Sequence, residues 1–179
     1  FLRCAERVIA QGGQVIYLVP EITLTHQLAL QVMKRFPNNV AVLHSGLTDS
    51  QRIAQWRRIN RSEVSLVIGA RSAVFAPFSN LKMIIIDEEH ENSYKSGNSP
   101  RYHARQVAQK RIADCGGKLL MGSATPSLEA WQLMKDPSKM TKLVLTSRVG
   151  GGSLPKVQIA DMTHENGIFS RLLQEKMLR

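Results

Sequence analysis

The sequence predicts an α/β fold in which a parallel sheet carries helices on both faces. Short apolar segments of strand length alternate with amphipathic segments of helical length from the first residue to about residue 134. The strand-like segments are continuously hydrophobic, which is typical of parallel strands that are covered on both faces. In such a sheet, crossover helices join successive strands and reactive residues gather beyond the carboxyl ends of the strands.

Five segments have the length and composition of strands, and helical patterns separate them. The strand candidates are residues 14–19 (QVIYLV), 40–43 (VAVL), 64–68 (VSLVI), 83–86 (MIII) and 118–121 (KLLM). The first helical segment, residues 1–9, places Leu2, Ala5 and Val8 on one side. It begins without an N-cap, and the helical residues 170–179 end without a stop signal. We therefore expect the chain to be a piece of a longer protein.

The remaining helices are predicted from apolar stripes and end signals. Residues 25–36 place Leu28, Val32, Met33 and Phe36 along one stripe. Residues 48–51 (TDSQ) form a capping box that opens a helix carrying Ile53, Trp56 and Ile59. Residues 101–114 are followed by a glycine pair, as expected at a helix C-cap. Thr125 and Pro126 are expected to cap a helix over residues 127–134, and both tryptophans, Trp56 and Trp131, are expected in the core.

The composition indicates a globular protein with a basic surface. The 179 residues contain 24 Lys and Arg against 14 Asp and Glu, which gives a formal net charge of +10. Because the basic residues are scattered, they suit a folded surface that follows a phosphate backbone, although a basic surface without a partner remains open. No apolar run is long enough for a membrane helix, and the two cysteines form no CxxC pair. We expect a cytoplasmic protein without a membrane partner.

An acidic cluster follows the strand candidate at residues 83–86. Asp87, Glu88, Glu89 and Glu91 place four carboxylates within five positions, although the chain as a whole is basic. An aspartate at the tip of a buried strand can hold a magnesium ion beside a nucleotide. The neighbouring glutamate can then polarise the water that attacks a phosphoryl group. Taken alone, the cluster is equally compatible with a solvated acidic turn.

Four motifs in order resemble those of superfamily 2 helicases. The segments are 83–90 (MIIIDEEH) and 122–127 (GSATPS), which resemble motifs II and III, and 19–25 (VPEITLT) and 69–73 (GARSA), which resemble motifs Ia and Ib. The longer stretches VAVLHSGLTDSQR, PRYHAR and GSATPSLEAW are similar to the primosomal replication-restart helicases. The resemblance implies a RecA-like three-layer fold for residues 1–148, the first helicase lobe in incomplete form. A linker over residues 149–155 and the start of a further helicase region over residues 156–179 would follow.

The resemblance implies ATP and Mg²⁺ as cofactors. Asp87 would coordinate the magnesium of MgATP, and Glu88 would be the catalytic base. His90 would contribute to the nucleotide site, and the motif III residues Ser123, Ala124 and Thr125 would couple the nucleotide state to the DNA contact.

It also implies two sets of DNA contacts. In motifs Ia and Ib, Pro20, Thr23, Thr25, Arg71 and Ser72 would grip one strand through its phosphates. Residues 92–103 resemble an aromatic-rich loop that senses single-stranded DNA. There Tyr94 and Tyr102 would stack on bases, and the cations Lys95, Arg101 and Arg105 would hold phosphates. A polar loop whose tyrosines pack locally is the alternative, and we expect His44 to make a local hydrogen bond.

The activity implied is that of an ATP-dependent 3′-to-5′ DNA helicase in replication restart and primosome assembly. Its partners would be single-stranded and forked DNA and other primosome and replication proteins. The 179 residues contain no G-x-x-x-x-G-K-[ST] loop, and residues 116–119 (GGKL) are only a near miss. We expect that loop before Phe1, and a second lobe with cysteine-bound zinc after Arg179, so this chain alone should be inactive as an ATPase. Another superfamily 2 DNA translocase and a non-catalytic nucleic-acid-binding module are the alternatives.

Overall fold

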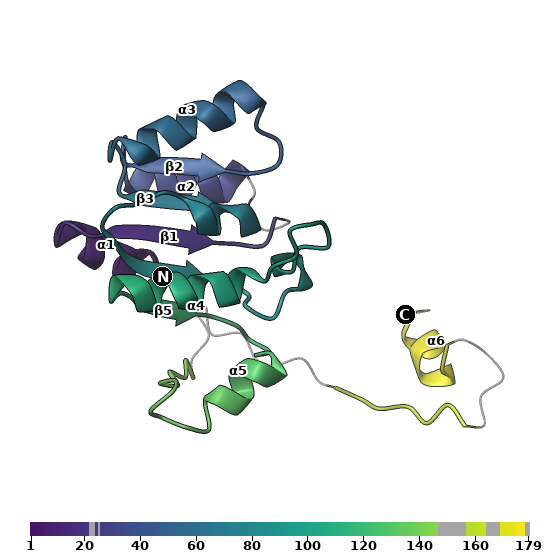
Figure 1. The fold of residues 1–179 in the computed structure, drawn as a ribbon. Coiled ribbons are helices and arrows are strands. Elements are labelled where there is room, and N and C mark those ends of the chain that lie inside the picture. Colours follow the sequence, from purple (N-terminus) through teal and green to yellow (C-terminus); the bar gives the residue numbers. More distant parts are fainter. Residues whose placement is uncertain (22–23, 25, 147–156, 164–168, 178–179) are drawn as a thin grey trace. The chain divides into compact units, whose positions relative to one another are not determined.

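The structure is a computed structural model that describes residues 1–179 except 22–23, 25, 147–156, 164–168 and 178–179. Its centre is a five-stranded sheet in the order β2-β3-β1-β4-β5, in which every pair of neighbouring strands is parallel (Figure 1). The strands are β1 (Gln14–Leu18), β2 (Val40–Leu43), β3 (Leu66–Gly69), β4 (Leu81–Ile86) and β5 (Lys118–Met121). The predicted RecA-like α/β fold is confirmed, with strand ends that differ from the prediction by two residues at most.

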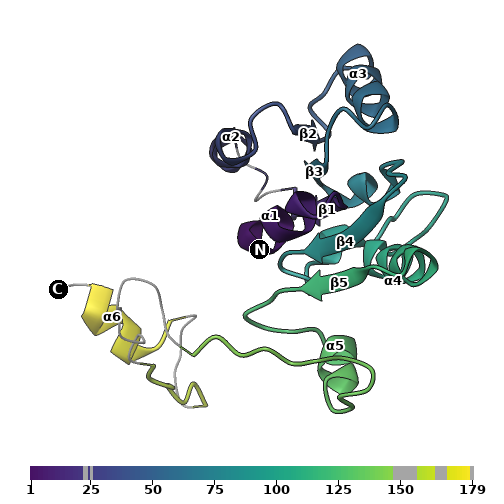
Figure 2. The ribbon, with the colours of Figure 1, turned by 90° about the vertical axis from the view of Figure 1, so that its left-hand side faces the viewer.

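Helices cover both faces of this sheet (Figure 2). On one face α1 (Leu2–Ala10) and α2 (His26–Arg35) pack against the strands, and their buried side chains include Ala5 and Val32. On the other face lie α3 (Asp49–Asn60), α4 (Ala104–Cys115) and the short 3₁₀ helix η1 (Arg71–Phe75). Ile16 and Ile84 of the central strands are fully buried beneath this second layer. The continuous hydrophobicity of the strands therefore reflects burial on two faces.

Two of the predicted helix-end signals are confirmed. The Thr48 side chain accepts a hydrogen bond from the Gln51 amide at 3.3 Å, and the Gln51 side chain accepts one from the Thr48 amide at 2.9 Å. Helix α4 ends at Gly116, whose φ of 62° lies in the left-handed region that glycine adopts without strain.

Other local predictions are wrong. The short helix α5 (Leu128–Leu133) is capped by Ser127, whose Oγ accepts from the Ala130 amide at 3.2 Å, so Thr125 is not its cap. Trp131 is 49% exposed and is not a core residue, whereas Trp56 packs against the core as expected. Helix α4 begins at Ala104 because the preceding residues close a loop through the bridge between Lys95 and His103.

The described residues fall into two compact units, Phe1–Met140 and Thr141–Arg179. The first unit contains the whole sheet and therefore every strand-end segment discussed above. The second contains α6 (Arg171–Met177), within the helix predicted for residues 170–179. The predicted linker at residues 149–155 lies outside the described residues. Where the structure is described, no helix has the length and apolar composition needed to cross a membrane.

Candidate functional site

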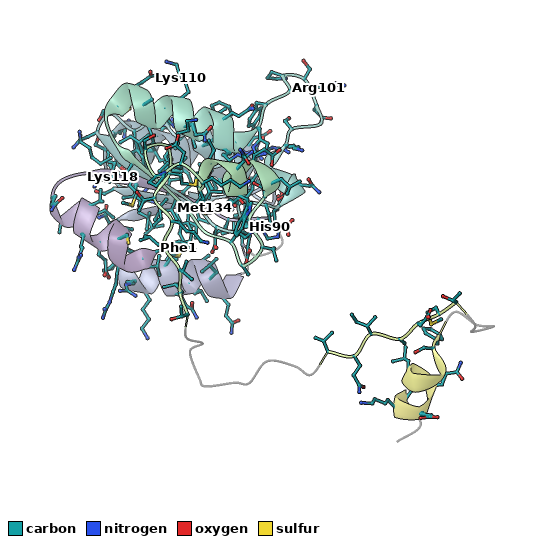
Figure 3. The ribbon with its side chains drawn as sticks, turned by 90° about the horizontal axis from the view of Figure 1, so that it is seen from below. Phe1, His90, Arg101, Lys110, Lys118 and Met134 are labelled. Carbon is teal, nitrogen blue, oxygen red and sulfur yellow. The ribbon has the colours of Figure 1, made fainter. Side chains whose placement is uncertain are left out.

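The candidate site lies where β1, β4 and β5 end, at one edge of the sheet. The three strands are neighbours and run parallel, so their carboxyl ends lie side by side. The Asp87 amide donates to the Leu18 carbonyl at 2.9 Å, and the Glu89 amide donates to the Gly122 carbonyl at 3.0 Å. In Figure 3 His90 lies at the end of the lobe opposite Lys118, the first residue of β5. The structure thus brings the predicted motif II and motif III segments together.

Asp87 is held in a fixed orientation by two tyrosines. Its Oδ2 accepts from the Tyr17 hydroxyl at 2.9 Å, and its carbonyl accepts from the Tyr94 hydroxyl at 2.7 Å. Its Oδ1 accepts from the Glu88 amide at 3.0 Å. Burial and the Asp87 carboxylate raise the pKa of the Tyr17 phenol well above its usual value, so this hydroxyl remains a donor.

The Asp87 carboxylate fits a cation that arrives with its own ligands. A carboxylate oxygen has two acceptor sites, so each oxygen of Asp87 keeps one after these bonds. Among the residues described, no group of three or more His, Cys, Asp or Glu side chains could form a metal site by itself. This matches magnesium bound to a nucleotide, which keeps waters and phosphate oxygens and takes only one or two carboxylates from a protein.

Glu88 has an unusual backbone conformation at this edge. Its φ is 44°, in the left-handed region that residues other than glycine rarely adopt. Its side chain is 43% exposed, and its Oε2 lies 3.6 Å from His90 Nδ1. Strained backbone of this kind is concentrated at functional sites, where the surrounding structure maintains it. Glu88 is therefore held in place while its carboxylate remains accessible to water.

His90 connects the segment after β4 to the segment after β5. Its Nδ1 lies 2.7 Å from the Ser123 hydroxyl oxygen, which also accepts from the Thr125 amide at 3.0 Å. Ala124 lies between these two residues in the loop and is exposed. A shift of either loop would therefore change the His90–Ser123 bond.

Glu89 is a site residue for which we predicted no individual role from the sequence. Its side chain is only 2% exposed and forms an ion pair with Arg105 at 3.1 Å. It also accepts from the Ser127 amide at 2.7 Å and from the Ser127 hydroxyl at 3.0 Å. Arg105 was expected among the phosphate-binding cations of the loop, but its side chain is 11% exposed and faces this cluster. A spacing of 38 residues between Glu89 and Ser127 leaves no local signal in the sequence.

Several residues expected to contact DNA make contacts within the protein. Arg71 donates to the carbonyls of Ser93 and Lys95, and its guanidinium lies 5.7 Å from the centre of the Tyr102 ring. Tyr94 is 1% exposed, so its ring is not available to stack on a base. This corrects the expectation for Tyr94 and favours local packing. Tyr102 is half-buried, with its ring 5.0 Å from that of Phe75.

The other proposed DNA contacts are partly accessible. Lys95, Arg101 and Ser72 are exposed, whereas Pro20 is buried and Thr23 and Thr25 lie outside the described residues. Ser72 lines a cavity of about 350 Å³ beyond the ends of β2 and β3. His44 lines the same cavity, and its Nδ1 accepts from the Gly46 amide at 3.1 Å, which confirms the expected local bond.

Comparisons with known proteins agree with this geometry. The DEAD/DEAH box helicase family matches residues 1–133. The replication restart protein PriA of Treponema pallidum is 53% identical over 176 residues, which cover 98% of this chain and 27% of that protein. PriA of Bacillus subtilis is 48% identical over 183 residues, which cover 99% of this chain and 22% of that protein. The chain thus spans about a quarter of the length of these curated relatives.

Two solved structures are similar to this chain over part of their length. The DUF1998 helicase MrfA bound to DNA and AMPPNP is 20% identical, with a TM-score of 0.45 over 73% of this chain and 21% of that chain. The C-terminal part of the Fun30 ATPase domain is 12% identical, with a TM-score of 0.44 over 77% of this chain and 43% of that chain.

Proposed function

The chain belongs to the DEAD/DEAH box helicase family, and on that premise we propose that it is the first motor lobe of a cytoplasmic, ATP-dependent 3′-to-5′ DNA helicase. The parent protein acts in replication restart and primosome assembly, together with other primosome proteins. The similarity to the replication restart proteins PriA supports the role in replication restart, and the direction is part of our proposal. The observation that carries the motor assignment is the hydrogen bond between His90 and Ser123, which joins the acidic segment to the neighbouring loop.

The side chains around β4 have distinct tasks in this proposal. When bound, MgATP supplies the phosphoryl group and the cation. Asp87 offers carboxylate oxygens to that cation, and the Tyr17 hydroxyl keeps the carboxylate from rotating. Glu88 orients a water molecule and takes its proton as the water attacks. The His90–Ser123 hydrogen bond couples a change at this site to a movement of the loop after β5.

The exposed cations near the 92–103 loop serve the DNA contact. Lys95 and Arg101 hold phosphates of a single strand, and Ser72 adds an exposed hydroxyl. Thr23 and Thr25 complete the strand contact in our proposal. Arg71 and Tyr102 act indirectly, because their contacts hold the loop that carries Lys95 and Arg101.

Strand separation by the full-length protein tests the assignment. We expect ATP-dependent unwinding of a forked duplex with a 3′ single-stranded tail and no unwinding of the matching duplex with a 5′ tail. Unwinding of both duplexes would refute the direction. DNA-stimulated ATP hydrolysis without unwinding of either would favour a different superfamily 2 translocase.

The purified 179-residue chain is expected not to hydrolyse ATP. None of its residues forms a glycine-rich loop ending in Gly-Lys-Thr or Gly-Lys-Ser, so the phosphates have no backbone cradle. Phosphate release should be measured with and without single-stranded DNA, with the full-length protein as the positive control. Steady turnover by the isolated chain would contradict this expectation.

Binding of single-stranded DNA is expected to depend on Lys95 and Arg101. The logarithm of the binding constant falls linearly with the logarithm of the salt concentration. Each phosphate contact that is lost should make this slope less steep by about 0.7. The paired substitution Lys95→Ala and Arg101→Ala in the full-length protein should therefore weaken binding at low salt and flatten that slope. Lys110→Ala is the control, because Lys110 is exposed and pairs with Asp114 within α4. An unchanged slope in the paired variant would exclude these two contacts.

A further inference from the structure

We propose that Glu89 is a positioning residue for Glu88. Its buried carboxylate, bound to Arg105 and Ser127, fixes the backbone that keeps Glu88 in its left-handed conformation. This inference rests on the proposed function, because it takes Glu88 as the residue that activates water. It assigns a task to a carboxylate that has no access to nucleotide or DNA.

The conformation of Glu88 requires support from both sides. A residue other than glycine keeps a φ of 44° only where its neighbours prevent it from relaxing. On the amino-terminal side, Asp87 is tied to Leu18 through its amide and to Tyr94 through its carbonyl. On the carboxyl-terminal side, the Glu88 carbonyl accepts from the Glu91 amide at 2.9 Å, and we infer that Glu89 supplies the attachment to the rest of the fold.

Glu89 has the contacts that this role demands. Its amide donates to the Gly122 carbonyl at 3.0 Å, while its Oε1 accepts from the Ser127 amide at 2.7 Å. Its Oε2 accepts from the Ser127 hydroxyl at 3.0 Å and from Arg105 Nη1 at 3.1 Å. These partners belong to the first turn of α4, the end of β5 and the cap of α5. Through its side chain and its amide, this one residue ties the segment after β4 to three other parts of the fold.

Burial holds the Glu89 side chain in the interior, bound to Arg105 and Ser127. The side chain of Glu89 is 2% exposed, whereas those of Glu88 and His90 on either side are 43% and 31% exposed. Glu89 thus faces the interior while the two flanking residues face the solvent. A buried carboxylate that already has a paired cation and two further donors cannot turn outward without leaving those groups unpaired. The peptide between Glu88 and Glu89 is consequently fixed, and with it the direction of the Glu88 carboxylate.

The test uses Glu89→Gln in the full-length protein. Gln keeps the shape and one acceptor oxygen but loses the charge that pairs with Arg105. We expect kcat for ATP hydrolysis at saturating single-stranded DNA to fall by about 10²-fold. The Glu88 carboxylate would be chemically unchanged but displaced, and a small displacement of a catalytic group slows a reaction by about this factor. KM for ATP should stay within about twofold, since Glu89 does not contact the nucleotide. Glu129→Gln is the matched control: its carboxylate is 3.9 Å from the same arginine but 68% exposed, so kcat should not change.

Ser127 provides an independent test that does not depend on the folding of Glu89→Gln. Ser127→Ala removes the hydroxyl that donates to Glu89, whereas Ser127→Thr keeps it. We expect the alanine variant to lose kcat with KM for ATP unchanged, and the threonine variant to retain kcat. A purely structural role would lower the melting temperature of the alanine variant without this separation of kcat from KM.

Three results would overturn the inference. They are wild-type kcat in folded Glu89→Gln, equal kcat in the alanine and threonine variants of Ser127, and a loss in Glu129→Gln as large as that in Glu89→Gln. Glu88→Gln measured in parallel separates this inference from the proposed function. If Glu88→Gln abolishes hydrolysis and the Glu89 and Ser127 variants do not, the positioning role alone is refuted. If Glu88→Gln hydrolyses ATP normally, the proposed function and the positioning role both fail.

Discussion

Replacing Glu88 by Gln in the full-length protein is expected to lower kcat for ATP hydrolysis by about 10²–10⁴-fold and to leave ATP binding intact. The glutamine amide has the shape of the carboxylate but cannot take a proton from the attacking water. The fold should tolerate the change, because the Glu88 side chain is 43% exposed and lies 3.6 Å from His90 Nδ1. Single-turnover hydrolysis and equilibrium nucleotide binding, measured on the same preparation, separate the two effects.

Glu91→Gln is the matched control for this experiment. Glu91 lies in the same acidic segment with a side chain 37% exposed, and its Oε1 is 3.9 Å from His90 Nε2. The substitution removes one negative charge from the same region. Because Glu91 has no catalytic role in our proposal, turnover should stay near that of the wild type. Unchanged turnover in Glu88→Gln would favour a non-catalytic nucleic-acid-binding module. Equal losses in both variants would mean that the local negative charge matters rather than a base at position 88.

The sheet and the position of the acidic segment were predictable from the sequence because their signals are local. Each strand is a continuous apolar run, and the capping box at Thr48 and the glycine after α4 mark helix ends within a few residues. Parallel strands then bring their carboxyl ends to one edge without further information. The proximity of the segments that begin at Asp87 and Gly122 follows from this rule, and the hydrogen bond between His90 and Ser123 agrees with it.

The contacts that fix the site were not predictable, because they join residues far apart in the chain. Tyr17 bonds to Asp87 across 70 residues, and Arg105 pairs with Glu89 across 16. The composition of the 92–103 loop also does not indicate which of its two tyrosines is buried. The loop contains enough polar residues to suggest a surface segment, but Tyr94 directs its hydroxyl to the Asp87 carbonyl and its ring into the core.

Tyr94→Ala is expected to lower the free energy of unfolding by about 3–5 kcal/mol, the cost of removing a large aromatic side chain from a packed core. Tyr94 is 1% exposed and ranks among the largest fully buried side chains. Urea denaturation of the 179-residue chain, followed by tryptophan fluorescence, measures the effect, because Trp56 and Trp131 both lie in the unit Phe1–Met140. Tyr102→Ala is the control within the same loop and should cost less, since that ring is only half-buried.

Comparison of Tyr94→Ala with Tyr94→Phe distinguishes packing from base stacking. If Tyr94 supports the core, Tyr94→Phe should retain most of the packing and lose about 1–3 kcal/mol, because the Asp87 carbonyl is left without its donor. If Tyr94 instead stacked on a base, its alanine variant would bind single-stranded DNA more weakly with no change in unfolding, and its phenylalanine variant would behave like the wild type. Because the hydroxyl of Tyr94 holds the residue that offers oxygens to the metal, we also expect Tyr94→Phe to reduce ATP turnover in the full-length protein. A stacking ring would leave that turnover unchanged at saturating DNA.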